Sequence, residues 1–325
     1  LHEVELNNPT NTTESITTIE SDLYIAKISS QSGGSVFSYK TKEHFSADSN
    51  YVNLISEENK NNLLLGFRDL SGDDVVLGAG WVQQEALDSL YLLEESRTIT
   101  FSNNLWGNKI TKTLTFYPES YLIDVDINLT AISDNILANS YSLGWGGGLP
   151  TTEKDTTDEA TYFGAFLYQG GELLDVKVGS GENFNNNYKG ETDWVATRSK
   201  YFVVSLLDGL GGQISGSNIS ATFDNKELYD IAIHLNSNNV AKVSLYLGPL
   251  EYDRIKSLDI RLESIMNFGW TIIRPVAKAV LWVLKSIHKC VVSKKSNKAD
   301  ISAGGFNSKR NFSPDCGCMK PKTDA

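Results

Sequence analysis

The sequence is poor in the residues that most small catalytic and metal sites require. It has three cysteines and four histidines in 325 residues, and no HxH, HExxH or CxxC motif brings them to metal-ligand spacing. Three cysteines also exclude a disulfide-dense scaffold in so long a chain. GxSxG, P-loop and dinucleotide-binding motifs are absent too. We therefore predict no catalytic residue, no metal site and no cofactor.

Positive charge and long apolar runs are scarce as well. The 29 Lys and Arg residues face 40 Asp and Glu residues, and the formal net charge of −11 excludes a typical nucleic-acid-binding protein. No run of 18 uncharged apolar residues is present, so the sequence predicts no membrane-spanning helix. Residues 1–8 lack the features of a signal peptide. We expect either a cytosolic protein or a piece of a longer one.

Alternating hydrophobicity dominates the chain up to residue 250. Residues 121–129 place Tyr, Ile, Val, Ile and Leu on one face and Asp, Asp and Asn on the other. In residues 109–116, one face carries Ile110, Lys112, Leu114 and Phe116. Such segments recur without intervening helical patterns, as in large antiparallel sandwiches. The sequence predicts an all-β domain over residues 15–250, preceded by an extension, residues 1–14.

Two polar stretches interrupt this pattern. Residues 144–159 begin with GWGGGLP and become acidic, and residues 179–190 read GSGENFNNNYKG. Both are too rich in glycine or polar residues for a regular element. We expect two loops, each either a mobile surface loop or a loop that contacts a ligand.

The hydrophobic period becomes helical after Gly248-Pro249. Apolar residues recur at intervals of three and four: Ile255, Leu258, Leu262, Ile265 and Met266. Pro249 stands at a plausible helix start and Gly269 at a plausible end. The spacing predicts one helix from Glu251 to Asn267, within a linker spanning residues 251–268.

A second helix is predicted over residues 269–292, with Pro275 in its first turn. It combines an apolar face, four cations on one stripe and two tryptophans: Arg274, Lys278, Lys285, Lys289, Trp270 and Trp282. A helix packed on the sandwich and a helix lying in a membrane interface both need this apolar face. The purely cationic polar face, in a chain of net charge −11, favours the membrane surface.

The last 33 residues differ from everything before them. Residues 293–325 hold seven Lys or Arg against three Asp, a net charge of +4, and show almost no apolar periodicity. This composition predicts a disordered basic tail. The Cys316-Gly-Cys318 motif falls within it without a nearby histidine, so we do not predict a metal site there.

Residues 193–202 read DWVATRSKYF, residues 247–253 read LGPLEYD, and residues 260–275 read IRLESIMNFGWTIIRP. These segments resemble the periplasmic domain of the YidC membrane-protein insertases, in its Bacteroidota-like form. The first resembles its WVAxRxKYF segment, and residues 247–250, with Tyr252-Asp253, resemble its LGPxxYD strand end. Residues 260–275 resemble its linker helix and the FGW entry to its interfacial helix. Residues 18–36 resemble its first two strands, with the Gly33-Gly34 turn between them. The residues that match are Gly33, Gly34, Trp194, Arg198, Tyr201, Phe202, Gly248, Pro249, Phe268, Gly269 and Pro275.

This resemblance implies a β-supersandwich of the galactose-mutarotase-like kind, followed by a linker helix and an amphipathic helix on the membrane surface. It implies a non-enzymatic domain on the periplasmic side of the bacterial inner membrane, which aids the insertion and folding of membrane proteins. The implied partners are the Sec translocon components SecD/SecF and SecY, together with nascent membrane proteins. The family's N-terminal anchor and transmembrane insertase core are absent from the sequence given.

A sugar-binding or mutarotase-like protein is the alternative. Mutarotase-like enzymes use general acid–base chemistry, typically a His and a Glu that converge on the sugar ring. Only His44 and His234 lie within the expected sandwich and away from its ends. His234 falls in a strand-like stretch, residues 231–235, on the face opposite Ile233 and Leu235. We interpret it as a strand-surface histidine.

Overall fold

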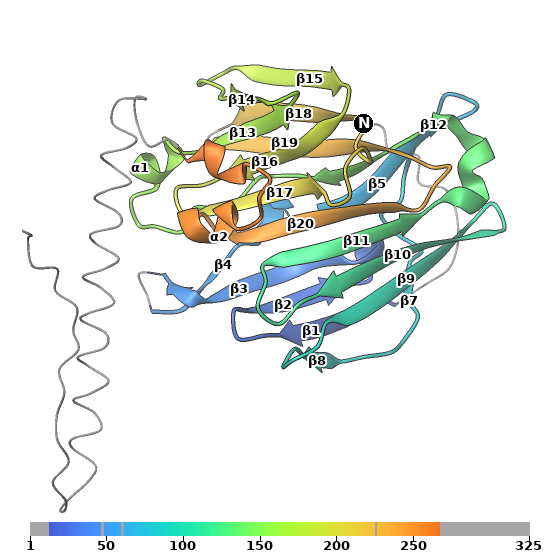
Figure 1. Ribbon diagram of the computed structural model, residues 1–325, viewed down its shortest axis with the longest axis horizontal. Coiled ribbons are helices and arrows are strands. Elements are labelled where there is room, and N and C mark those ends of the chain that lie inside the picture. Colours follow the sequence, from blue (N-terminus) through green and yellow to red (C-terminus); the bar gives the residue numbers. More distant parts are fainter. Residues whose placement is uncertain (1–12, 47–48, 60–61, 225, 267–325) are drawn as a thin grey trace, which may run out of the picture. The chain divides into compact units, whose positions relative to one another are not determined.

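Strands make up most of the region that the structure describes. The computed structural model describes residues 13–46, 49–59, 62–224 and 226–266, all of which belong to one compact unit, residues 1–266. Figure 1 shows these strands stacked in layers. The predicted all-β class is confirmed. The helix predicted over residues 269–292, the tail 293–325 and most of the extension 1–14 lie outside the described residues.

The strands form three sheets. The five-stranded sheet has the order β4 (Tyr51–Asn53), β3 (Ser35–Phe45), β2 (Tyr24–Ser29), β1 (Ile16–Glu20) and β8 (Ser89–Tyr91). The nine-stranded sheet has the order β14 (Glu172–Val176), β13 (Gly164–Gln169), β16 (Thr192–Arg198), β17 (Phe202–Asp208), β20 (Ala241–Pro249), β11 (Leu122–Asn128), β10 (Asn108–Phe116), β9 (Arg97–Leu105) and β7 (Val82–Gln83). The six-stranded sheet has the order β15 (Asn183–Lys189), β18 (Gly216–Asp224), β19 (Lys226–Asn236), β12 (Ile136–Trp145), β5 (Asn62–Asp69) and β6 (Asp74–Val76).

Helical segments are short in the described part of the chain. The two α-helices are α1 (Thr156–Ala160) and α2 (Tyr252–Lys256). The 3-10 segments are η1 (Gln31–Gly33), η2 (Glu57–Asn59), η3 (Thr130–Asn135) and η4 (Leu262–Ile265).

Alternation explains the central strands as the sequence predicts. In β11 the buried residues Ile123, Val125 and Ile127 alternate with half-buried Asp124 and Asp126. Side chains of successive strand residues point to opposite faces, so one face of this strand enters the core. β11 pairs antiparallel with β10 on one side and with β20 on the other.

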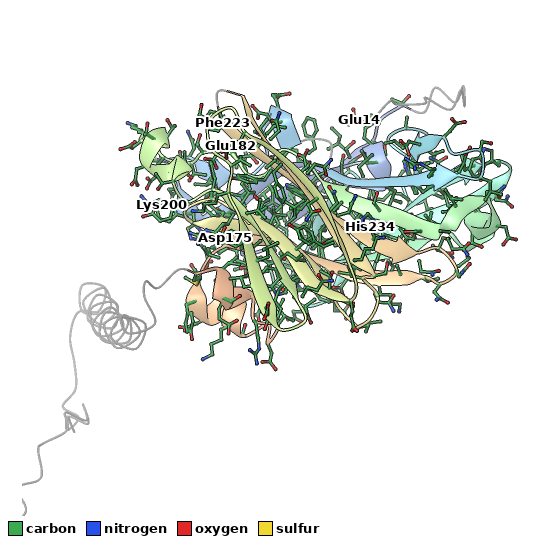
Figure 2. All side chains as sticks on the ribbon, turned by 90° about the horizontal axis from the view of Figure 1, so that it is seen from above. Glu14, Asp175, Glu182, Lys200, Phe223 and His234 are labelled. Carbon is green, nitrogen blue, oxygen red and sulfur yellow. The ribbon has the colours of Figure 1, made fainter. Side chains whose placement is uncertain are left out.

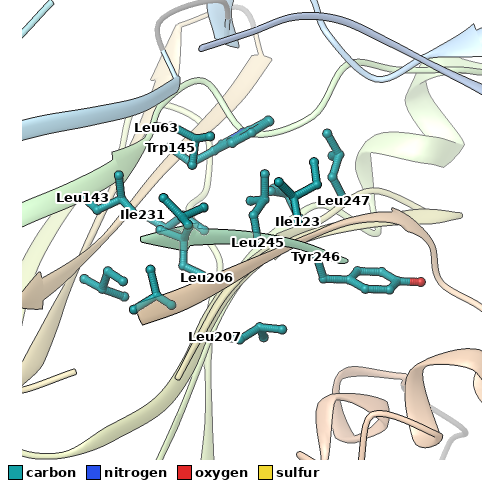
Figure 3. Close-up of a cluster of buried hydrophobic side chains, with 14 of the residues drawn as sticks. Leu63, Ile123, Leu143, Trp145, Leu206, Leu207, Ile231, Leu245, Tyr246 and Leu247 are labelled. Carbon is teal, nitrogen blue, oxygen red and sulfur yellow. The ribbon is translucent and has the colours of Figure 1, made fainter. Parts of the chain in front are cut away.

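The core lies between the nine-stranded and six-stranded sheets. Its buried side chains come from β11, β17 and β20 on one side and from β5, β12 and β19 on the other, and Figure 3 labels eight of them: Leu63, Ile123, Leu143, Trp145, Leu206, Ile231, Leu245 and Leu247. Leu207 and Tyr246, also labelled there, are buried on the opposite face of the nine-stranded sheet. Burying one such side chain fully stabilises the fold by about 1.5–3 kcal/mol. This close packing makes the sandwich rigid, so the residues on its surface are held in defined positions.

One lysine lies inside this core. Lys112 is fully buried in β10, on the apolar face where the alternation places it. Its Nζ donates to the carbonyl oxygens of Ser32 at 3.0 Å and Leu63 at 2.5 Å. Burial lowers the pKa of this amine to about 7. Lys112 therefore ties the turn after β2 to the start of β5, at the cost of desolvating an amine.

The Gly33-Gly34 turn is packed too closely for larger residues. A Cβ on Gly33 would lie 2.8 Å from the Trp81 ring, and one on Gly34 would lie 2.7 Å from a methyl group of Leu114. Both glycines also have positive φ, of 69° and 106°. The turn lies between β2 and β3, after two strands rather than between the first two.

The expectation of one helix over residues 251–267 is wrong for the part that the structure describes. The chain forms α2, then turns, and then forms the single 3-10 turn η4. Asp259 and Arg261 adopt positive φ of 55° and 61°, which no α-helix contains. The buried residues Ile255, Leu262 and Ile265 pack on the sandwich, and this packing overrides the helical spacing.

The two expected loops are partly regular. Residues 144–159 contain the end of β12 and the start of α1, whose N-terminus is capped by Asp155 accepting from the Asp158 backbone. Residues 183–189 form β15, which pairs with β18 along its whole length. Asn218 donates to the side chains of Asn185 and Asn187 across this pair. Hydrogen bonds between asparagine side chains of the two strands therefore stabilise β15, a strand that its polar composition does not predict.

Lys112 makes the stability of the domain depend on pH. Its folded pKa of about 7 lies below the ordinary lysine value of about 10.4, so the unfolded chain binds more protons between these values. The free energy of unfolding should therefore rise with pH above 7, by up to about 1.4 kcal/mol per pH unit from this group.

Urea unfolding of the wild type and Lys112→Met at several pH values between about 7 and 9 measures this slope; above that range tyrosine ionisation interferes. The variant should lack this contribution, although it leaves two carbonyls without their donor. Parallel pH profiles for the two proteins would contradict the assignment.

Candidate functional site

The motif over residues 193–202 forms most of β16, a turn and the first residue of β17. Trp194 and Arg198 are four residues apart in one strand, so their side chains share one face of the nine-stranded sheet. The Trp194 ring is fully buried, stacks on Tyr168 at 5.5 Å, and donates from Nε1 to the carbonyl of Ile260 at 2.9 Å.

Arg198 makes a second contact of the same kind. Its guanidinium donates to the carbonyl of Ile265 at 2.9 Å, and its Nε donates to the carbonyl of Ser199 at 2.9 Å. Burial lowers the pKa of Arg198, while the nearby Asp175 carboxylate opposes this shift. Burial also raises the pKa of Asp175. The buried guanidinium is thus held by backbone carbonyls and balanced by one carboxylate.

These donors hold what we call the exit segment, residues 251–266, the last part of the chain that the structure describes. Ile255, Leu262 and Ile265 bury their side chains against the sandwich. Trp194 binds the carbonyl just before η4, and Arg198 binds the carbonyl at its end. The exit segment is therefore attached at two backbone points as well as by apolar packing.

The strand end that leads into the exit segment is equally constrained. A Cβ on Gly248 would lie 2.7 Å from the Tyr121 ring, so this position has no space for a side chain. Tyr246 donates its hydroxyl to the carbonyl of Pro249 at 2.8 Å, and the Leu250 amide donates to the carbonyl of Tyr201 at 2.7 Å. The two motifs at residues 193–202 and 247–250 thus meet beside the exit segment.

A polar cluster lies at the β16–β17 turn. Lys200 Nζ lies 2.7 Å from an oxygen of Asp158 and 3.1 Å from one of Glu153, and Tyr201 donates its hydroxyl to Glu153 at 2.5 Å. The Tyr201 hydroxyl, followed by Lys200, lowers the pKa of Glu153. The buried Glu159 accepts from the Thr152 and Glu153 amides and so fixes the loop that carries the cluster. Figure 2 shows Lys200 at the same end of the molecule as α1.

The sequence motifs identify only part of this arrangement. Trp194, Arg198, Tyr201, Phe202, Gly248 and Pro249 all lie around the exit segment, whereas Gly33 and Gly34 lie in the core turn beneath Trp81. The carboxylates of Glu153, Asp158 and Glu159 were not predicted, because they lie in a stretch interpreted as a loop. Nine predicted residues lie outside the described residues: Phe268, Gly269, Trp270, Arg274, Pro275, Lys278, Trp282, Lys285 and Lys289.

Comparison with known proteins decides the family. The sequence model of the YidC periplasmic domain matches residues 16–283, which include both motifs and the whole exit segment. The chain belongs to the YidC periplasmic-domain family. The resemblance found in the sequence is confirmed.

The curated relatives of this YidC domain are longer proteins. Membrane protein insertase YidC of Chlorobaculum parvum is 32% identical over 286 residues, and that of Chlorobium luteolum is 30% identical over 280 residues. Each alignment covers 83% of this chain and 48% of the relative, so the chain spans about half the length of these relatives. Within the described residues, no helix is sufficiently long and hydrophobic to cross a bilayer.

Solved structures with a similar arrangement are distant in sequence from this YidC domain. A galactose mutarotase related enzyme from Lactobacillus acidophilus is 11% identical, with a TM-score of 0.42, and the match covers 72% of this chain and 97% of that one. A family GH36 α-galactosidase from Geobacillus stearothermophilus is 10% identical, with a TM-score of 0.38, over 73% of this chain and 41% of that one. Such low identity carries no information on activity.

The two sandwich histidines of the YidC domain lie on different sheets. His234, in β19, has its pKa lowered by burial. His44, at the end of β3, lies 3.6 Å from a carboxylate oxygen of Glu251 and 5.3 Å from the Phe202 ring. A cavity of about 220 Å³ beside Trp194 is lined by Tyr168, Asp193, Asp208, Asp259 and Arg261 among others, and by neither histidine.

Removing the Arg198 guanidinium should loosen the exit segment selectively. Hydrogen bonds from charged groups contribute about 1.5–3 kcal/mol, so Arg198→Met should speed amide exchange in residues 252–266 by roughly 10- to 100-fold. Hydrogen–deuterium exchange measures this, and protection of β11 and β20 should be largely kept.

Arg68→Met is the matched control, because it removes the same charge from an exposed pair with Asp74 on the six-stranded sheet. Unchanged protection of residues 252–266 in Arg198→Met, or an equal loss in the control, would show that Arg198 does not hold the exit segment.

Proposed function

We propose that this chain is the periplasmic domain of a YidC-type membrane-protein insertase, on the periplasmic side of a bacterial inner membrane. Its role is to aid the insertion and folding of membrane proteins through protein contacts rather than catalysis. The family match over residues 16–283 and relatives named membrane protein insertases support this proposal. Within the described residues, no group of three or more His, Cys, Asp or Glu side chains is arranged to hold a metal ion.

The anchored exit segment is the observation that carries the proposal. A domain joined to its neighbour by a free linker takes up many orientations. Here Trp194 and Arg198 bind the exit segment within the matched region, so the chain leaves the sandwich from a fixed place. A fixed departure point allows the domain to hold a constant orientation toward the membrane segments of a longer insertase.

The proposed partners are the Sec translocon components SecD/SecF and SecY, and nascent membrane proteins. The proposed membrane contact is the segment at residues 269–292, with its cations at Arg274, Lys278, Lys285 and Lys289. Each cation near an anionic surface contributes about 1 kcal/mol of attraction. Each would instead cost about 2.5–3.5 kcal/mol at the centre of a bilayer, which opposes a spanning orientation.

A domain exchange tests this function. Residues 16–283 of this chain would replace the matching region of the Chlorobaculum parvum insertase, with a photoreactive residue at exposed positions such as Leu173 or Asn186. We expect the chimera to crosslink to translocon subunits or nascent chains and to support insertion of a reporter membrane protein.

The same chimera with Arg198→Met serves as the comparison, since it should keep the sandwich but lose the fixed orientation and part of the insertion activity. A chimera that inserts nothing and crosslinks to neither partner class, although it is folded, would count against the proposal.

A further inference from the structure

Four aromatic side chains are exposed at the end of the domain where the exit segment leaves. Phe45 and Tyr51 are 62% and 40% exposed on the β3–β4 hairpin, and Tyr162 and Tyr201 are 41% and 42% exposed beside α1 and β17. We call these four residues the exit aromatics. Figure 1 shows the β3–β4 hairpin, α1 and α2 together at this end, on the left of the view.

Direct contacts connect the hairpin to the start of β17. The rings of Phe45 and Tyr51 lie 5.4 Å apart. His44, next to Phe45, packs edge-on against the ring of Phe202 at 5.3 Å, and Phe202 follows Tyr201 in the chain. The hairpin that carries Phe45 and Tyr51 therefore lies beside the start of β17, which Tyr201 precedes.

Lys200 extends this surface to α1. Its ammonium lies over the Tyr201 ring at 5.1 Å and over the Tyr162 ring at 5.6 Å. The same ammonium pairs with Glu153 and Asp158 and offsets half of their combined negative charge. A lysine beside exposed tyrosines is the combination that favours a boundary between water and apolar material.

The carboxylates near the hairpin are offset in the same way. Arg254 lies 3.0 Å from an oxygen of Glu43 and 3.2 Å from one of Glu251. These two carboxylates thus share one guanidinium, which offsets half of their combined charge. The repulsion between this end and an anionic surface is reduced accordingly, in a chain whose net charge is −11.

The direction of the chain indicates what covers this surface. The described residues end at Met266, beside the carbonyl that Arg198 holds, and the following sequence carries the four cations of the 269–292 stripe. Cations on an amphipathic segment are attracted to anionic lipid headgroups. Tyrosine and tryptophan are favoured at the depth of those headgroups, and phenylalanine is typical of the apolar face of an interfacial segment.

We propose that the exit aromatics dock on an anionic lipid surface, with the rings of Phe45, Tyr51, Tyr162 and Tyr201 in the headgroup region. In this orientation, the end of the domain that carries the exit aromatics contacts the membrane surface. The proposed function requires only that the domain works beside the membrane, so this inference rests on it but goes further by naming the face and its occupant.

An environment-sensitive fluorophore tests the orientation in the full chain. The three native cysteines at positions 290, 316 and 318 are first replaced by serine, and single cysteines are then introduced as Phe45→Cys and Tyr201→Cys. The matched controls are Leu137→Cys at the start of β12 and Val240→Cys just before β20, at positions of similar exposure, 44% and 43%, at the opposite end of the strands.

The probe surface is vesicles of phosphatidylethanolamine and phosphatidylglycerol. On vesicle-bound protein, the emission maximum of labels at positions 45 and 201 should shift to shorter wavelength. Lipids that carry a quencher in the headgroup region should quench the fluorescence of these labels. Labels at positions 137 and 240 should stay in water. Without a label, the double variant Phe45→Ser with Tyr51→Ser should weaken vesicle binding by roughly fivefold to tenfold, and Leu137→Ser with Val240→Ser should not.

Three results would overturn the docking face. They are labels at 45 and 201 that remain as hydrated as the controls, a full chain that ignores these vesicles, and shielding that appears only when a partner protein is added. Crosslinks from the domain exchange that persist in any of these cases would leave the proposed function intact, so the two failures are distinguishable.

Discussion

The position of the exit segment depends on one interaction, in which side chains of strand β16 bind two backbone carbonyls of that segment. The Trp194 indole holds the carbonyl of Ile260, and the Arg198 guanidinium holds that of Ile265. A buried guanidinium is costly unless its donors are satisfied, so this arrangement is stable only with the exit segment in place. The same contacts that satisfy Arg198 therefore determine where the chain leaves the sandwich.

The exit segment also joins parts of the domain that are distant in sequence. Its first turn carries Arg254, which pairs with Glu43 of β3 and lies over the Tyr121 ring at 4.8 Å. Tyr121 in turn occupies the space that Gly248 leaves free. The five-stranded sheet, the nine-stranded sheet and the exit segment thus meet at one end through packed rings and paired charges.

Much of the fold could be predicted from the alternation of residues, including the unusual position of Lys112 on the core face of β10. The prediction of one helix over residues 251–267 was wrong because the spacing of its apolar residues reflects their burial against the sheet. The positive φ angles of Asp259 and Arg261, which interrupt the helix, could not be predicted from the local sequence. β15 was missed because its stability comes from pairing with β18 and from Asn218, which are non-local.

The candidate site was predictable only where resemblance pointed to it. Trp194 and Arg198 stood out as motif residues, yet nothing in the sequence shows that their partners are carbonyl oxygens some 66 residues away. Glu153 and Glu159 gave no signal, because a loop carboxylate becomes a structural anchor only when tertiary contacts bring it to Tyr201 or to the Thr152 amide. Contacts between distant segments create this site.

A distance measurement between two spin labels tests the anchored exit most directly. The labels are placed by Lys242→Cys at the exposed start of β20 and Met266→Cys at the end of the exit segment, in the full chain without its native cysteines. Pulsed electron paramagnetic resonance should give a single narrow distribution of distances between the labels. This distribution should broaden when Trp194→Phe and Arg198→Met are combined. A distribution that is already broad in the otherwise native sandwich would contradict a fixed point of departure.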